Sequence, residues 1–153
     1  MIYISHRGNV RGKVPQIENH PTHIKYALGA GYNVEVDLWL VNDRLVLGHD
    51  EPLYEITDAY LYNQDLWFHA KNVEAFEYLM NKKVRCFWHT DEDFVLTSKG
   101  DIWVYPDKPL IDNSIAVLPE ITNYTIDQLK NCYAICSDNI IFYKRSIDGN
   151  TNS

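Results

Sequence analysis

The sequence lacks the features that mark several classes of protein. No apolar run approaches the roughly 20 residues that a helix needs to cross a bilayer, and the first residues do not join a basic segment to an apolar one. We therefore expect no stable membrane insertion and no secretory signal. The chain has only three cysteines, none in a CxxC pair. This pattern favours buried, reduced thiols in a cytoplasmic protein.

Positive charge is also scarce. The chain has 14 Lys and Arg against 21 Asp and Glu, a formal net charge of -7. That balance disfavours nucleic acid or an anionic membrane surface as the main partner, but a local cationic site could still bind a small phosphorylated molecule. Repeats, low-complexity tracts and a domain linker are absent. The 153 residues suffice for one domain with a real core, which we assign to residues 1–147, followed by a polar tail at 148–153. The sequence leaves the oligomeric state open.

Short apolar runs dominate what is present, and they predict a series of buried strands. Seven runs qualify: 2–5, 33–38, 66–71, 85–89, 101–106, 114–120 and 133–138. The second continues through a turn at Asn42 and Asp43 into a hairpin, and 94–100 predicts a small hairpin arm. The segment 139–143 is an eighth short strand or a turn.

Helical patterns are fewer than strands. Apolar spacing predicts helices over 22–31, 73–82 and 125–131, the last with Thr125 as its N-cap. Three connections, 90–100, 107–113 and 51–65, are too short or too weakly patterned for a helix. The sequence therefore predicts an α/β fold, a reduced TIM-like (β/α) barrel with seven to eight strands and several helices missing. An open parallel sheet is the alternative.

Two carboxylates stand out in the second run. Glu35 and Asp37 are two residues apart in a strand, so their side chains point to the same face. Val34, Val36 and Leu38 face the opposite side. Two like charges on a buried strand are costly unless a cation neutralises them. A divalent metal is the natural candidate.

Other polar side chains end neighbouring runs. His6, His49 and His89 end apolar runs, and His69 and Lys71 share one face of the 66–71 strand. Because ligand sites of parallel α/β folds lie at the carboxyl ends of the strands, we expect these side chains to converge on one rim. His89 is for this reason a candidate substrate contact.

The order of these motifs resembles the glycerophosphodiester phosphodiesterase family, within the superfamily of barrels that includes the phosphatidylinositol-specific phospholipases C. The resemblance rests on His6-Arg7-Gly8, a loop with Glu18-Asn19, Val34-Glu35-Val36-Asp37 and Leu45-Val46-Leu47-Gly48-His49-Asp50. Lys71 and the run Ile135-Cys136-Ser137-Asp138 are similar to later family motifs. The match is closest over residues 2–50.

This resemblance implies a metal-dependent hydrolysis of a small phosphodiester. Glu35 and Asp37 would hold Mg²⁺ or Ca²⁺, which prefer oxygen ligands. His6 and His49 would be the acid and base. Arg7 would contact phosphate oxygens, as Asn19 would from the nearby loop, and Lys71 would neutralise charge in the transition state.

His69 departs from the family pattern, because it stands where the family has a third acidic ligand. As a metal ligand, its imidazole would admit Mn²⁺ or Zn²⁺. Glu120 or Asp50 could instead complete the site. The departure also keeps two other functions open: a non-catalytic protein that binds a phosphate or sugar ligand, and a metal-independent cyclising lyase.

Overall fold

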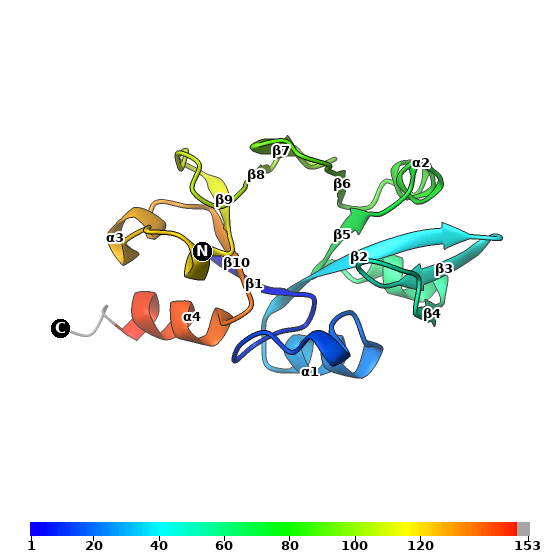
Figure 1. Cartoon of the computed structure of the whole chain (residues 1–153), viewed down its shortest axis with the longest axis horizontal. Helices are drawn as coiled ribbons and strands as arrows, with labels where there is room; N and C mark the ends of the chain where they lie inside the picture. The colour runs from blue at the N-terminus through cyan, green and yellow to red at the C-terminus, as the bar shows by residue number, and fades with distance from the viewer. Residues whose placement is uncertain (150–153) are drawn as a thin grey trace.

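The computed structural model describes residues 1–149. Eight strands form a curled sheet with the shape of a half-barrel (Figure 1). In spatial order they are β6 (Cys86–Trp88), β5 (Leu66–Ala70), β2 (Asn33–Val41), β1 (Ile2–His6), β10 (Ala134–Ser137), β9 (Ser114–Val117), β8 (Ile102–Val104) and β7 (Phe94–Leu96). Neighbours pair in parallel, except that β7 is antiparallel to β8. The mixed α/β class is confirmed, and the curled sheet is consistent with a reduced barrel.

Two further contacts shape the sheet. β2 continues beyond the curl and pairs in antiparallel fashion with β3 (Arg44–Leu47), which pairs with β4 (Tyr54–Ile56). The two outer strands of the curl, β6 and β7, approach each other at one point. There the Ser98 amide donates to the Cys86 carbonyl at 2.8 Å, and the Cys86 amide donates to Ser98 Oγ at 3.0 Å. The two edges of the curled sheet are therefore joined by these two hydrogen bonds and not by regular strand pairing.

Four α-helices lie outside the curled sheet (Figure 1). They are α1 (Pro21–Gly29), α2 (Val73–Asn81), α3 (Ile126–Leu129) and α4 (Ile140–Asp148), and short 3-10 helices occupy Pro15–Ile17, Asp58–Tyr62 and Pro119–Ile121. The three helices expected from the sequence are confirmed. Their N-termini carry the caps that begin helices: Asn72 accepts from the Ala75 amide, and Thr125 forms a capping box with Gln128.

The segment 139–143 was predicted as a strand or a turn, and this prediction is wrong. It begins α4, whose buried residues Ile140, Tyr143 and Ile147 follow the spacing of one helical face. The polar tail was expected to begin at residue 148, which is also wrong. Asp148 is the last residue of this helix and accepts a 2.6 Å hydrogen bond from the Tyr3 hydroxyl. The rest of that tail, 150–153, lies outside the described residues.

Alternation along the strands divides the core into an outer and an inner layer. Outward-facing Val34, Val36 and Leu38 are fully buried in the layer between the sheet and the helices. The inner layer is a separate apolar cluster: Ile4, Trp67, Phe87, Trp103, Ile115, Val117, Ala134 and Cys136. Aromatic rings therefore fill the inside of the curl and form a solid floor beneath the strand ends. The three cysteines are buried free thiols, as expected.

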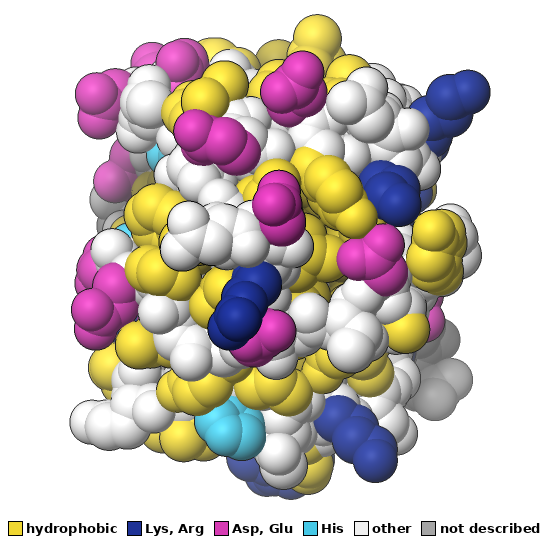
Figure 2. Space-filling model, turned by 90° about the vertical axis from the view of Figure 1, so that its right-hand side faces the viewer, with side chains coloured by type: hydrophobic (Ala, Val, Ile, Leu, Met, Phe, Trp, Pro, Cys, Tyr) yellow, Lys and Arg dark blue, Asp and Glu magenta, His cyan; other side chains and the backbone are white. Residues whose placement is uncertain are grey.

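The outer surface mixes all types of side chain. Figure 2 shows the side that carries α2 and the β3–β4 hairpin, where hydrophobic, acidic and basic groups are interspersed. Val73 and Met80 of α2 are exposed there. Among residues 1–149, no helix has the length and apolar character needed to cross a membrane.

Candidate active site

Strand alternation brings the expected residues to one face. His6, Glu35 and Trp67 are neighbours across three parallel strands, and Asp37, His69 and Phe87 form the next row. Since the two rows lie two residues apart, all six side chains point into the curl. The apolar members form the floor, and the polar members stand at the carboxyl ends of the strands.

A cleft of about 390 Å³ opens above this floor. Seven of the nine residues proposed from the sequence line it: His6, Arg7, Glu35, His49, His69, Lys71 and His89. The other two, Asp37 and Asn19, lie fully buried just behind the cleft wall. Asn19 donates to Asp37 Oδ2 at 2.8 Å and accepts from the Asp37 amide at 2.9 Å. Asn19 therefore positions Asp37 and does not line the cleft as the substrate contact we expected.

Glu35, Asp37 and His69 form a compact cluster. Each offers one ligand atom, and the three atoms lie within 4.8 Å of one another. All three side chains are buried. In the described part of the chain, no other group of histidine, cysteine or acidic residues has this arrangement. Glu120 and Asp50 are outside the cluster: Glu120 accepts from the Asp138 amide at 2.7 Å, and Asp50 pairs with His49.

Asp37 is surrounded by positive charge. Arg7 Nε lies 3.0 Å from Oδ2, and His69 Nδ1 and Lys71 Nζ lie 3.0 and 3.6 Å from Oδ1. Burial alone would raise the pKa of Asp37, but the hydrogen bond from His69 and the charge of Arg7 hold that pKa well below its usual range. Asp37 is therefore ionised at neutral pH.

Glu35 has a different environment. Its nearest basic nitrogens, on His6 and His69, are both 3.8 Å away. Burial, followed by the charge of Asp37, raises the pKa of Glu35. Its Oε2 is buried without a hydrogen-bond donor. This orphaned oxygen, with the Asp37 carboxylate and the His69 imidazole beside it, belongs to a donor set that fits a divalent cation. These three residues could hold one metal ion.

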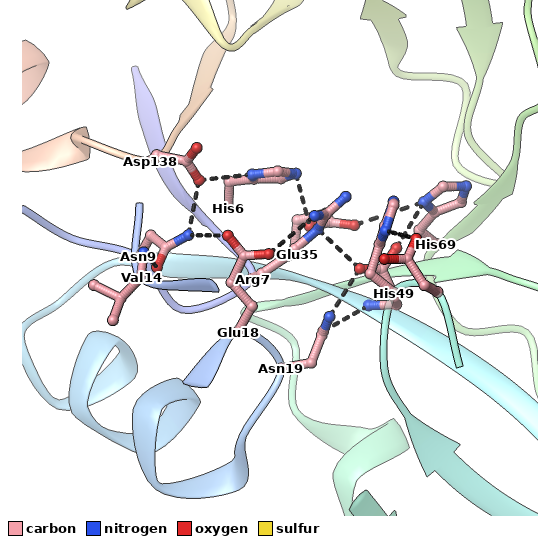
Figure 3. Close-up of polar contacts among 12 residues, drawn as sticks. His6, Arg7, Asn9, Val14, Glu18, Asn19, Glu35, His49, His69 and Asp138 are labelled. Carbon is pink, nitrogen blue, oxygen red and sulfur yellow. Dashed lines mark hydrogen bonds and ion pairs between the residues drawn. The ribbon is translucent and has the colours of Figure 1, made fainter. Parts of the chain in front are cut away.

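His6 is fixed on its other side by Asp138 (Figure 3). His6 Nδ1 lies 2.7 Å from Asp138 Oδ1. Burial opposes the charged imidazole, but the Asp138 hydrogen bond and the charge of Glu35 outweigh it, so the pKa of His6 is raised. Because the Asp138 carboxylate can only accept, Nδ1 carries the hydrogen, and Nε2 faces the cleft side of the ring, toward Glu35.

Asn9 joins two parts of the site. Its fully buried amide donates to Asp138 at 2.8 Å and to Glu18 at 3.0 Å. Glu18 in turn accepts from Arg7 at 3.0 Å. Figure 3 shows Asn9 between the His6–Asp138 pair and the Glu18–Arg7 pair. The Asn9 side chain therefore connects His6, the candidate catalytic residue, to Arg7, the candidate phosphate-binding residue.

His49 lies on a tightly built turn after β3. The Gly48 amide donates to the Asp37 carbonyl at 3.1 Å, and the Gly48 carbonyl accepts from Trp39 Nε1 at 2.6 Å. A Cβ on Gly48 would lie 2.0 Å from the Glu51 carbonyl oxygen, so only glycine fits. Burial and the nearby Arg7 charge lower the pKa of His49.

His89 and Tyr105 form the opposite wall. Their rings stack with centroids 3.8 Å apart, and the His89 ring lies 5.8 Å from that of His69. Burial, then the charge of His69, lowers the pKa of His89. Burial and the charge of Glu35 raise the pKa of Tyr105, which keeps it a neutral phenol. This wall offers a flat, partly apolar surface to a ligand.

Asp138 and Asn9 were not among the expected site residues. Asp138 is the last residue of the predicted 133–138 strand, so the same strand-end argument that selected His89 could have found it. Asn9 carries no such signal, because a polar asparagine in a loop of polar residues is ordinary. Its role depends on the meeting of two carboxylates that lie nine and 129 residues away along the chain.

Comparison with family models, with curated proteins and with solved structures gives no significant match. The case for any family therefore rests on the residues of the site alone.

Proposed function

We propose that the protein is a metal-dependent phosphodiesterase that hydrolyses a small glycerophosphodiester-like substrate by acid–base catalysis with His6 and His49. One observation carries the proposal: two histidines with oppositely shifted pKa values line the same cleft as Arg7, Lys71 and the Glu35–Asp37–His69 cluster. An acid and a base that work together at neutral pH need this split. The family resemblance of the sequence, and a curled sheet that is consistent with a reduced barrel, support the same proposal.

The chemistry assigns one role to each histidine. His49, neutral, accepts the proton of a substrate hydroxyl next to the phosphodiester, and the oxygen of that hydroxyl forms a bond to phosphorus. The bond from phosphorus to the leaving alcohol breaks as His6, protonated and held by Asp138, donates its proton to the departing oxygen. The first step leaves a cyclic phosphate, and in the second step the roles reverse. His6 takes a proton from water, and the water oxygen forms a bond to phosphorus. The bond from phosphorus to the former hydroxyl oxygen breaks as His49 returns its proton to that oxygen, which opens the ring.

The remaining side chains bind and orient the phosphoryl group. Arg7 and Lys71 line the cleft and supply positive charge to its non-bridging oxygens. Glu35, Asp37 and His69 would hold one divalent cation, which when bound adds further neutralising charge there. The two carboxylates suit Mg²⁺ or Ca²⁺, and the imidazole nitrogen of His69 also admits Mn²⁺ or Zn²⁺.

The test is turnover of bis-p-nitrophenyl phosphate and of glycerophosphodiesters with each of these four metals. His6→Ala and His49→Ala should lower kcat by about 10²- to 10⁴-fold, the usual contribution of a general acid or base. His20→Asn is the matched control: His20 does not line the cleft, and asparagine can replace it as the N-cap of α1. Turnover no higher than in the two alanine variants, with every metal, would exclude the proposal.

A second candidate function is a non-catalytic protein that binds a phosphate or sugar ligand. It is favoured by the contacts of Asp37, which already has three basic partners, Arg7, His69 and Lys71. Asp37 therefore does not need a metal ion to balance its charge. A binding protein would be stabilised against heat by phosphate or sugar phosphates while showing no turnover. Stabilisation by metal together with metal-dependent turnover would decide for the enzyme.

A further inference from the structure

A second hollow lies outside the cleft, between the loop after β1 and the start of α4. It has a volume of about 420 Å³ and is lined by Arg11, Asn139, Ile141, Phe142, Arg145 and Ser146. None of these residues lines the cleft. The hollow is therefore separate from the site described above.

The arginines of this hollow differ from the others. The chain has five arginines, and Arg7, Arg44 and Arg85 each pair with a carboxylate. Within residues 1–149, Arg11 and Arg145 form no ion pair, and both line the same hollow. Two guanidinium groups that line one hollow without a carboxylate partner can both bind the same anion.

The surroundings keep the hollow positive. The loop of residues 8–17, which carries Arg11, also contains Lys13 and has no Asp or Glu, in a chain whose net charge is -7. The acidic residue of α4, Asp148, is occupied by Tyr3 and Lys144. Asp138, which precedes Asn139 of the hollow, is likewise engaged elsewhere, by His6 and Asn9.

The two arginines stand on segments that are fixed to each other. The Gly12 amide donates to the Asp138 carbonyl at 2.8 Å, and the Ile141 amide donates to the Val10 carbonyl at 3.2 Å. These bonds hold the Arg11 loop against the first turn of α4. The N-terminal end of that nine-residue helix adds positive potential. Phe142, which is 50% exposed, supplies an apolar wall.

We propose that this hollow binds a phosphate monoester, with Arg11 and Arg145 on the phosphate oxygens and Phe142 against the apolar part of the ligand. Guanidinium forks match the geometry of phosphate oxygens, and a site with one apolar wall suits an ester better than a bare ion. The same chemistry occurs in soluble phosphate esters and in lipid phosphate headgroups. The site does not depend on the proposed phosphodiesterase activity.

Titration of the ¹⁵N-labelled full chain with phenyl phosphate, at constant ionic strength, tests the proposal through the side-chain Nε–Hε signals of the arginines. The signals of Arg11 and Arg145 should shift saturably. Arg11→Gln or Arg145→Gln should weaken this binding about tenfold or more, as expected for a lost charge-assisted hydrogen bond. The control Arg44→Gln should bind phenyl phosphate as the parent does, and all three variants should keep any phosphodiesterase activity.

Two arms separate the possible sources of the phosphate. Sedimentation with phosphatidic acid vesicles, dependent on Arg11 and Arg145 and absent with phosphatidylcholine alone, would identify a lipid headgroup. Saturable phenyl phosphate binding without sedimentation would identify a soluble ester. Shifts confined to Arg7 would overturn the proposal, because phenyl phosphate would then bind only in the cleft. Equal shifts with chloride at the same ionic strength would also overturn it, because the hollow would then bind anions without selectivity for phosphate.

Discussion

Replacing Asp37 by asparagine should strongly destabilise the metal-free protein, whereas replacing Glu35 by glutamine should not. Both changes remove one negative charge from the same buried cluster and preserve side-chain volume. The two carboxylates differ only in their partners. Three basic groups lie within 3.6 Å of Asp37, while the nearest to Glu35 lie at 3.8 Å.

The magnitude follows from these contacts. The Asp37 variant leaves Lys71, which is only 16% exposed, without a carboxylate partner among the described residues, and leaves Arg7, which is 13% exposed, with Glu18 alone. Removing one partner of a buried ion pair costs about 3–5 kcal/mol. The Glu35 variant relieves repulsion between two carboxylates and loses no hydrogen bond from a neighbouring donor. Its stability should change by less than about 1 kcal/mol or rise.

Equilibrium urea unfolding in EDTA at pH 7, followed by tryptophan fluorescence, measures both changes. Glu55→Gln is the control, since its ion pair with Arg44 is more than half exposed on both sides and contributes about 0–1 kcal/mol. Equal destabilisation by the Asp37 and Glu35 variants would refute the reasoning, because it would mean that Glu35 is held by contacts as strong as those of Asp37.

Adding metal should lower the stability of both variants relative to the parent protein. A cation that binds only the folded parent protein stabilises it by about 2.7 kcal/mol at a concentration 100 times its Kd. The Asp37 and Glu35 variants should both lose this increment, since each lacks one ligand. An undiminished metal increment in either variant would place the ion elsewhere.

Three further predictions concern single residues. Asp138→Asn should lower kcat about tenfold or more with little change in KM, because the amide no longer stabilises a protonated His6; steady-state kinetics that show only a raised KM would contradict this. Gly48→Ala should unfold the His49 turn and lower Tm by several degrees, whereas Gly29→Ala, where a Cβ meets nothing within 4 Å, should leave Tm unchanged or raise it. Leu79→Ala, at a fully buried position of α2, should cost about 2–5 kcal/mol in urea unfolding, and a loss below 1 kcal/mol would show that the helix packs loosely.

Local patterns predicted the elements whose signals lie within a few residues. The strands around Val34–Leu38 and 66–71 have apolar runs and clear ends, and α2 has both a cap and a regular apolar face. The prediction for the start of α4 was wrong because Ile140, Ile141 and Phe142 form an apolar run as short as those of the strands. Its helical spacing becomes visible only when Ile147 is included.

Part of the candidate site was accessible to the same reasoning. A strand presents alternate residues to one side, so Glu35 and Asp37 had to share a face, and parallel strands had to bring His6 and His69 to the same edge. What alternation cannot specify is which groups neutralise each other across the edge. That depends on loops whose course the sequence pattern does not fix.

Asn19 shows where such reasoning stops. The sequence places an asparagine in a loop near the expected phosphate, and a contact with substrate is a reasonable inference. In the fold the loop turns back at this residue, whose φ is +62°, a conformation that asparagine tolerates better than most residues. The turn aims its amide at Asp37. Asn19, which was expected to contact the substrate, instead holds Asp37, a candidate metal ligand, in place, and Asn9 does the same for Asp138 and Glu18. The polar loop after β1 therefore serves the site mainly through buried amides, and the charged groups of the cleft owe their positions to residues that never reach it.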